Sequence, residues 1–333
     1  NYQSYNAGIF ITEKYSYKKW DFEGGVRFDY KSIYNTTDNE NKFSYPDLNF
    51  NNLSGNIGTQ YRLNSSTRLL INTSTAWRAP QVNELYANGL HHGASRLERG
   101  NQNLQAERSM SIGAGMIFNQ SWLELDVNTY FKNINGFIFL QPDFPPELTI
   151  RGAFPVFSYN QTDARLHGAD MNAVIHVDKH IDITLQGSVL RAWDLKLNDW
   201  IIQMPADRIE FQTTYHFSNA GKIFDTYISA GASYVSRQIR VPATGNIELP
   251  NTDPVVKQSD YLMPPSAYWL AKLEAGTKFR WAHQNCNLIL SVTNLFDHAY
   301  RDYMNAFRYF SDEMGRNISL RLHIPFVIFH QHK

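Results

Sequence analysis

The chain of 333 residues is longer than an ordinary domain and carries no formal net charge, with 31 basic and 31 acidic residues. This balance argues against nucleic-acid binding, which usually needs a basic surface, and the single cysteine, Cys286, excludes an internal disulfide framework and a cysteine-based zinc site. Aromatic residues make up 14% of a chain whose mean hydropathy is −0.43, a mixture typical of a protein with one apolar and one wet surface.

Alternation of apolar and polar residues dominates the chain. It is clearest at residues 20–31, 123–132, 181–189 and 317–326. Strict alternation is typical of strands with one apolar and one polar face, and no apolar run approaches the roughly eighteen residues of a membrane-spanning helix. We predict thirteen strands, at residues 2–17, 19–34, 50–63, 65–78, 107–119, 121–141, 154–178, 180–197, 206–218, 222–240, 266–282, 284–297 and 314–326.

The connections between these strands alternate between two kinds. Six are tight turns, and six are longer loops at residues 35–49, 79–106, 142–153, 198–205, 241–265 and 298–313. Most predicted strands exceed the five or six residues that are about usual in soluble proteins, and they are long enough for a membrane strand, which needs about nine to eleven residues in the hydrocarbon. The predicted fold class is therefore all-β, a transmembrane antiparallel up-and-down β-barrel. A large soluble β-protein is the alternative.

The odd number of strands needs an explanation, because bacterial single-chain barrels have an even number. Either one strand escapes the pattern, or the chain is the C-terminal part of a larger barrel. We prefer the second, because the alternation is already under way at the first residues and no signal-peptide pattern precedes it. We expect residues 1–326 to form the barrel and residues 327–333 to form a C-terminal tail.

Four motifs follow one another beside the longest predicted loop: Trp-Arg-Ala-Pro at 77–80, Asn-Glu-Leu-Tyr at 83–86, Gly-Asn-Gln-Asn-Leu at 100–104 and Glu-Arg-Ser at 107–109. Val-Thr-Asn-Leu-Phe-Asp at 292–297, Tyr300 and Gly-Arg-Asn at 315–317 come later. This ordered set resembles the barrel domain of TonB-dependent outer-membrane receptors over essentially the whole chain. The resemblance implies a bacterial outer-membrane location, about 13 strands of a 22-stranded barrel, and a plug, absent from this chain, that contacts the TonB complex.

Within that family the resemblance is to receptors for zinc and for haem, which carry an Arg-Ala-Pro box and an Asn-x-Asn-Leu-like box with histidine between them. His91 and His92 lie in this interval. Trp77 and Gln102 replace residues usual in haem receptors, whereas the Glu-Leu-Tyr-x-x-Gly-x-His-His run at 84–92 is more similar to the zinc receptors. The resemblance implies active import of a metal ion or metal chelate, with zinc and haem as the two candidate cargoes.

The histidines are the first candidate ligands, because neutral imidazole binds zinc, copper and haem iron. Neighbouring residues of an extended loop point opposite ways, so a bend at Gly89 or Gly93 would be needed for both to hold one ion. Zinc takes about four ligands. The candidate metal ligands are His91, His92, Glu98 and His298, with Glu84, Asp297, Asp302 and Asp312 as further carboxylates. Haem would instead use one histidine, with Arg96 or Arg99 near its propionates, and the alternative is a polar loop whose histidines bind nothing.

Other motif residues are expected to shape the fold. Proline suits a strand terminus, and Gly100–Leu104 followed by Glu107 is typical of a turn into the next strand. The predicted structural residues are Arg78, Pro80, Asn101, Asn103, Leu104, Glu107 and Phe326, the last matching the family's terminal aromatic. The sequence lacks a Gly-x-Ser-x-Gly elbow, a phosphate-binding glycine loop and a His-Glu-x-x-His helix. We expect no enzyme and no catalytic cofactor; a passive porin or adhesin, or a receptor for a siderophore, cobalamin or glycan, is the alternative function.

Overall fold

The computed structural model describes residues 2–35, 46–241, 264–281 and 284–325. In this part of the chain, thirteen long strands form one antiparallel sheet in which each pairs with the next, as the alternation predicts. The strands are β1 (Tyr2–Tyr17), β2 (Trp20–Asn35), β3 (Leu48–Arg62), β4 (Thr67–Arg78), β7 (Glu107–Gln120), β8 (Leu123–Thr149), β9 (Gly152–His176), β10 (Ile181–Asp194), β12 (Arg208–His216), β13 (Ile223–Val235), β14 (Tyr268–Trp281), β15 (Gln284–Thr293) and β16 (Asn317–His323). Phe326 and the predicted tail lie outside the described residues.

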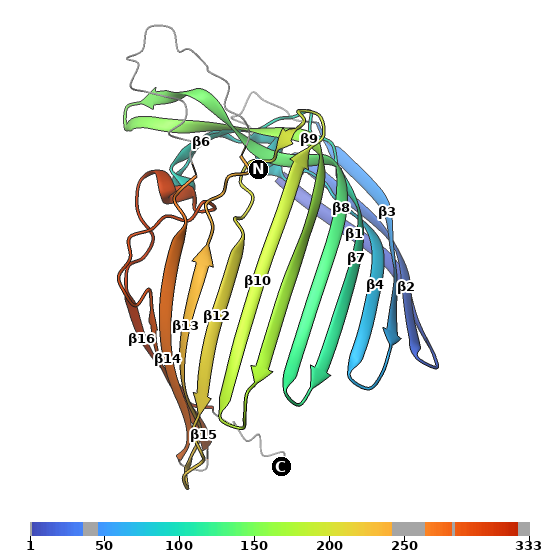
Figure 1. Ribbon diagram of the computed structural model, residues 1–333. Helices are drawn as coiled ribbons and strands as arrows, with labels where there is room; N and C mark the ends of the chain where they lie inside the picture. The colour runs from blue at the N-terminus through green and yellow to red at the C-terminus, as the bar shows by residue number, and fades with distance from the viewer. Residues whose placement is uncertain (1, 36–45, 242–263, 282–283, 326–333) are drawn as a thin grey trace, which may run out of the picture.

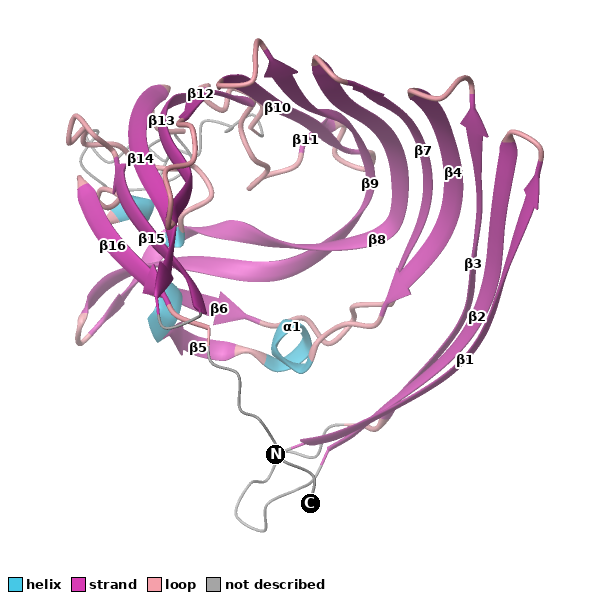
Figure 2. Ribbon diagram, turned by 90° about the horizontal axis from the view of Figure 1, so that it is seen from below, coloured by secondary structure: helices cyan, strands magenta, loops and turns pink. Residues whose placement is uncertain are grey.

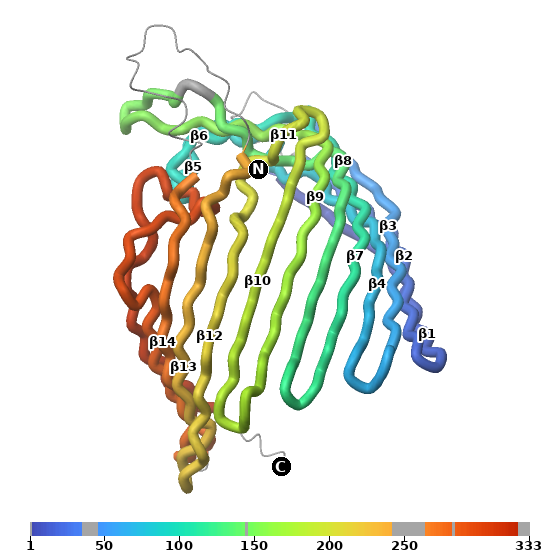
Figure 3. The backbone as a smooth tube through the Cα atoms, in the orientation of Figure 1, coloured from blue at the N-terminus to red at the C-terminus, as the bar shows by residue number. Residues whose placement is uncertain are grey.

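The sheet curls into a barrel wall that is open on one side. Figure 2 shows the strands following an arc, with β1 and β16 at its two ends. The backbone tube of Figure 3 follows the meander from β1 to β14, with tight turns at one end of the wall and long loops at the other. No pairing joins β1 to β16 in the part of the chain that the structure describes. Among these residues, no helix is long and apolar enough to cross a membrane.

The two faces of the sheet differ in chemistry, as the alternation predicts. In β12, Phe211 lies opposite Leu185 and Ala232, whereas its neighbour Gln212 lies opposite Thr184 and Gly231. The register carries this division from strand to strand. Large apolar side chains are exposed along the apolar face, including Val26, Leu53, Ile71, Ile112, Phe211, Ile228, Leu290 and Leu320. Such exposure is what a barrel wall against lipid requires.

The polar face is the concave one. Three short strands lie in the long loops. One of them, β11 (Asp199–Trp200), pairs with the last two residues of β10 and lies inside the arc in Figure 2. After β11 the chain packs Ile201 against Ala164 and Ala192, which share the sheet face of the polar residues. The polar side chains therefore line the inside of the wall.

The β8–β9 hairpin extends beyond the wall and bends across its mouth (Figure 1). The prediction of a loop at residues 142–153 is wrong, because β8 continues to Thr149 and β9 starts at Gly152. Two register shifts interrupt the ladder, between Ile134 and Phe137 and between Asp143 and Glu147. Proline has no N–H to give to a ladder and is tolerated at a bulge, so the second shift lets the strand pass through a proline-containing stretch. We call residues 137–162 and 79–106 together the cap.

Candidate functional site in the cap

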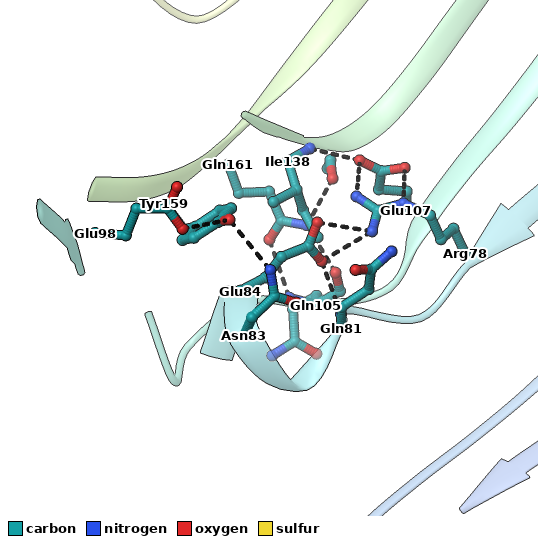
Figure 4. A network of polar contacts seen from close by, with 11 residues as sticks. Arg78, Gln81, Asn83, Glu84, Glu98, Gln105, Glu107, Ile138, Tyr159 and Gln161 are labelled. Carbon is teal, nitrogen blue, oxygen red and sulfur yellow. Dashed lines mark hydrogen bonds and ion pairs between the residues drawn. The ribbon is translucent and has the colours of Figure 1, made fainter. Parts of the chain in front are cut away.

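The cap begins with a charged network at the end of β4 (Figure 4). Arg78 is the last residue of β4 and lies directly opposite Glu107, the first residue of β7. Its Nε and Nη2 donate to the two Glu107 oxygens at 2.9 Å, and its Nη1 donates to both Glu84 oxygens at 2.8 Å. Glu107 also accepts the backbone N–H of Ile138 in β8 at 2.6 Å. One guanidinium group thus joins β4, β7 and the segment between them to the cap hairpin.

A short helix continues from this network. In α1 (Val82–Tyr86), the Glu84 carboxylate accepts the backbone N–H of Gln81, which covers a free donor at the helix start. Leu85 is 2% exposed and packs with three other buried side chains, Leu104, Ile138 and Tyr159. Gly100 runs close behind the helix, because a Cβ there would lie 2.5 Å from the Tyr86 nitrogen. The motif residues therefore meet around one small apolar cluster.

The turn within the motif at residues 100–104 is built by asparagine. Asn101 Oδ1 accepts the backbone N–H of Asn103 at 2.9 Å, an arrangement typical of turns. The Asn101 N–H donates to the Glu84 carbonyl at 2.8 Å. Leu104 enters the apolar cluster, and Pro80 is fully buried at the loop exit. Each contact made by these residues holds the loop in place.

A histidine-bearing hairpin lies between these motifs. It consists of β5 (Asn88–His91), the 3-10 turn η1 (His92–Ala94) and β6 (Arg96–Arg99). Strand β6 pairs in parallel with β9, with Leu97, Glu98 and Arg99 opposite Val156, Phe157 and Ser158. This parallel pairing attaches the hairpin to the cap.

Glu98 points into the cap and is 4% exposed. One of its oxygens accepts Arg96 Nε at 2.8 Å, and the other accepts the Tyr159 hydroxyl at 3.2 Å. The Tyr159 hydroxyl in turn accepts from Asn83 at 3.3 Å, and the Arg96 guanidinium lies 5.0 Å from the centre of the Phe157 ring. The carboxylate is thus engaged by a cation and a hydroxyl inside the cap.

His91 and His92 are both exposed at the bend of the hairpin. The predicted bend is present here: η1 follows His91 directly, and Ser95 has a positive φ of 48°. The His91 ring lies near Gly93, because a Cβ at that glycine would be 3.3 Å from His91 Cε1. The two imidazoles are therefore accessible to a ligand from outside the cap.

His298 lies in the final long loop, after β15. Asn294 holds this loop, since its amide donates to the His298 carbonyl and its oxygen accepts the His298 N–H, both at 2.9 Å. The His298 side chain is exposed. Farther along, the 3-10 turn η2 (Ala306–Tyr309) lies near β6: burial raises the pKa of Tyr309, against a smaller lowering by the cations Arg308 and Arg96.

The predicted ligands do not form one group. Among the described residues, no three His, Cys, Asp or Glu side chains lie together as a metal site requires. Several candidates have partners inside the chain: Glu84 binds Arg78, Asp297 accepts from Arg316, Asp302 accepts from Tyr268, Asp312 pairs with Arg301, and Arg99 pairs with Glu147. A zinc site at His91, His92, Glu98 and His298 stays a prediction.

Tyr159 and Asn83 are contributors that the sequence pattern does not identify. Tyr159 belongs to a long strand whose alternation gives no sign that its hydroxyl meets Glu98, which lies 61 residues earlier in the chain. Asn83 belongs to a motif in which the sequence assigns it no role. The pairing of β6 with β9 brings Glu98 to Tyr159, and the packing of α1 against the apolar cluster brings Asn83 to it.

The substitution Glu98→Gln tests whether this carboxylate is a structural partner. It leaves Arg96, whose side chain is 16% exposed, without its counter-charge. We expect the free energy of local opening of β6 from β9 to fall by about 1–2 kcal/mol. Hydrogen exchange of the β6 amides in the full-length protein measures this. Tyr159→Phe, which removes one hydroxyl, should have a smaller effect of about 1 kcal/mol. Unchanged exchange in Glu98→Gln would contradict the structural assignment.

Residues 1–295 match the family model described as TonB dependent receptor-like, beta-barrel. The chain is 22% identical over 373 aligned positions to TonB-dependent heme receptor A of Haemophilus influenzae (strain 86-028NP), covering 96% of this chain and 44% of that protein. It is also 25% identical to the Vitamin B12 transporter BtuB of Photobacterium profundum, over 41% of this chain and 19% of that protein.

Solved structures agree with the fold. The copper transporter OprC superposes with a TM-score of 0.74 at 18% identity, covering 96% of this chain and 47% of that one. The FrpB iron transporter from Neisseria meningitidis has a TM-score of 0.64 at 15% identity, covering 95% of this chain and 44% of that one. The chain therefore spans under half the length of these relatives.

Proposed function

This chain belongs to the family of TonB-dependent receptor-like β-barrels, and on this basis we propose that it is the barrel portion of an active-transport receptor in a bacterial outer membrane. The receptor would bind a metal ion or metal chelate at its extracellular loops and import it with energy from the TonB complex. The names of its relatives, a heme receptor, a copper transporter and an iron transporter, support cargo of this class. Contact with TonB would require a plug segment that is not part of these 333 residues.

One observation carries the choice of site: the histidine hairpin is anchored on its inner side and free on its outer side. The Arg78 network and the β6–β9 pairing fix its base, whereas His91 and His92 are exposed at its bend. A rigid base with accessible imidazoles is a suitable arrangement for capturing a metal from solution. Zinc and haem are the two cargoes we propose, with His298 as a further ligand from the last loop.

Calorimetric titration of the full-length receptor with zinc and with haem tests the proposal. We expect one of them to bind. The variants His91→Ala and His92→Ala should lower the affinity for that cargo at least about tenfold to hundredfold, the loss that follows when a residue supporting a metal ligand is removed. His323→Ala is the matched control, because this exposed histidine ends β16 near the tight-turn end of the wall. If neither cargo binds, or both variants bind as the wild type does, the proposal is wrong.

A further inference from the structure

Three side chains form a hydrogen-bonded row at the tight-turn end of the wall. Asp182, near the start of β10, lies directly opposite His176, the last residue of β9. His176 Nδ1 lies 2.7 Å from one Asp182 carboxylate oxygen, and Nε2 of His216, at the end of β12, lies 2.9 Å from the other. We call His176, Asp182 and His216 the histidine bridge. One carboxylate thus links the ends of three neighbouring strands.

The histidine bridge lies on the wet side of the wall, at its edge. Asp182 comes two residues before Thr184 in β10 and therefore shares the concave face with it. The His176 N–H donates to the carbonyl of Trp122 at 2.9 Å. Trp122 belongs to the tight turn between β7 and β8 and is exposed, as expected of the aromatic girdle at the membrane boundary. The bridge is therefore outside the lipid-spanning part of the strands and open to protons from water.

His176 has a carboxylate at each of its ring nitrogens. Besides the Asp182 contact of Nδ1, its Nε2 lies 3.5 Å from Glu124 in β8. A neutral imidazole carries one N–H, so only the imidazolium form can donate at both nitrogens. The pKa of His176 is accordingly raised, chiefly by its hydrogen bond with Asp182. The contacts of this ring are thus strongest when it carries a proton.

The charge of the cluster depends on the two imidazoles. When both are protonated, His176 and His216 balance the carboxylates of Asp182 and Glu124. When both are neutral, the same four side chains carry two negative charges on adjacent strands. Opposite charges across neighbouring strands stabilise their pairing, whereas like charges destabilise it. Proton loss therefore weakens the pairing at these strand ends.

Other titratable groups surround the histidine bridge. His216 lies opposite Tyr227 in β13, with ring centres 6.5 Å apart, and the Tyr227 hydroxyl donates to Glu274 in β14 at 2.6 Å. In the turn between β9 and β10, His180 Nδ1 lies 2.8 Å from the carbonyl oxygen of His216. The remaining charged residues of this turn are Asp178 and Lys179. Carboxylates, lysine and tyrosine keep one charge state between about pH 6 and pH 9, so the histidines are the groups that titrate there.

We propose that the histidine bridge is a pH-dependent link between strands: its protonated imidazoles hold the turn-side ends of β9, β10 and β12 together, and their deprotonation lets these ends open more often. The stabilisation is complete below about pH 6.5, where a histidine of the unfolded chain is protonated, and is lost as the pH rises through the higher pKa of the folded state. This role is separate from cargo capture, because the bridge and the cap lie at opposite ends of the wall.

Hydrogen exchange of the full-length protein in neutral detergent tests the proposal between about pH 6 and pH 9. After correction for the intrinsic effect of pH on exchange, we expect the protection of amides at residues 181–184 and 214–216 to fall roughly twofold to fivefold across this range, as loss of a cross-strand ion pair would give. Asp182→Asn should give low protection at every pH. His176→Lys should lessen the fall, because an amine stays charged up to about pH 10.

His180→Gln is the matched control. This histidine lies in the same turn, but its ring meets a backbone carbonyl, so the variant should keep the full pH-dependent fall. His176→Lys separates charge from structure, since a purely structural role of the imidazole would give lower protection at every pH. The proposal is wrong if the wild type shows no fall, if Asp182→Asn keeps it, or if His180→Gln removes it.

Discussion

Replacing Arg78 with alanine should loosen the loop part of the cap, residues 79–106, from the ends of β4 and β7, and lower its stability by about 2–4 kcal/mol. The Glu84 and Glu107 side chains are 10% and 14% exposed and would face each other without a counter-charge. Removing one partner of a buried ion pair costs about 3–5 kcal/mol, and the value is smaller here because the Arg78 side chain is 36% exposed. Limited proteolysis of the cap and hydrogen exchange of α1 in the full-length protein measure the loss.

Arg99→Ala is the matched control for Arg78→Ala. Its pair with Glu147 also lies in the cap, but the two side chains are 54% and 50% exposed. An exposed pair contributes about 0–1 kcal/mol, so the cap should stay closed in this variant. If the cap opened equally in the two variants, an exposed ion pair would hold it as well as the buried Arg78 network does, and the network would have no special role.

Replacing Phe211 with lysine should destabilise the wall in a membrane. Phe211 lies near the middle of β12 on the convex face and is 44% exposed. A lysine at the lipid face of a barrel costs about 2–4 kcal/mol near the membrane midplane. The free energy of unfolding of the full-length protein in lipid vesicles, measured by denaturant titration, gives the change.

Gln212→Lys is the companion to Phe211→Lys, one residue along the strand on the concave face. It should alter the free energy of unfolding little, because its ammonium group would lie in the wet interior. If Gln212→Lys destabilised the protein as much as Phe211→Lys, the assignment of the two faces would be wrong.

The strands and their faces could be predicted because they depend on local alternation. In β10, Ile183, Leu185 and Val189 alternate with polar residues, and this order alone defines the strand and its apolar side. Loop ends were less predictable: the predicted loop at residues 142–153 is instead part of the β8–β9 ladder, which continues past a register shift between Asp143 and Glu147. In this stretch the pairing of β8 with β9 outweighs the local β-propensity of the residues.

The cap could not be predicted, because its contacts join residues distant in sequence. Glu98 was a reasonable metal ligand when only its type and neighbourhood were known. Its actual partner, Arg96, lies two residues away, and the Tyr159 hydroxyl reaches it only through the parallel pairing of β6 with β9. Motif residues such as Arg78 and Glu107 were recognised, but their direct pairing required the register of β4 and β7.

That parallel pairing has a mechanical consequence. Each inner strand of the wall pairs with a neighbour on both sides, whereas β6 pairs with β9 through three residue pairs, at Leu97, Glu98 and Arg99. Regions held by few contacts open at a free energy far below that of global unfolding. We therefore expect the first local opening of the cap to occur at the hairpin that bears His91 and His92, while each barrel strand keeps its register.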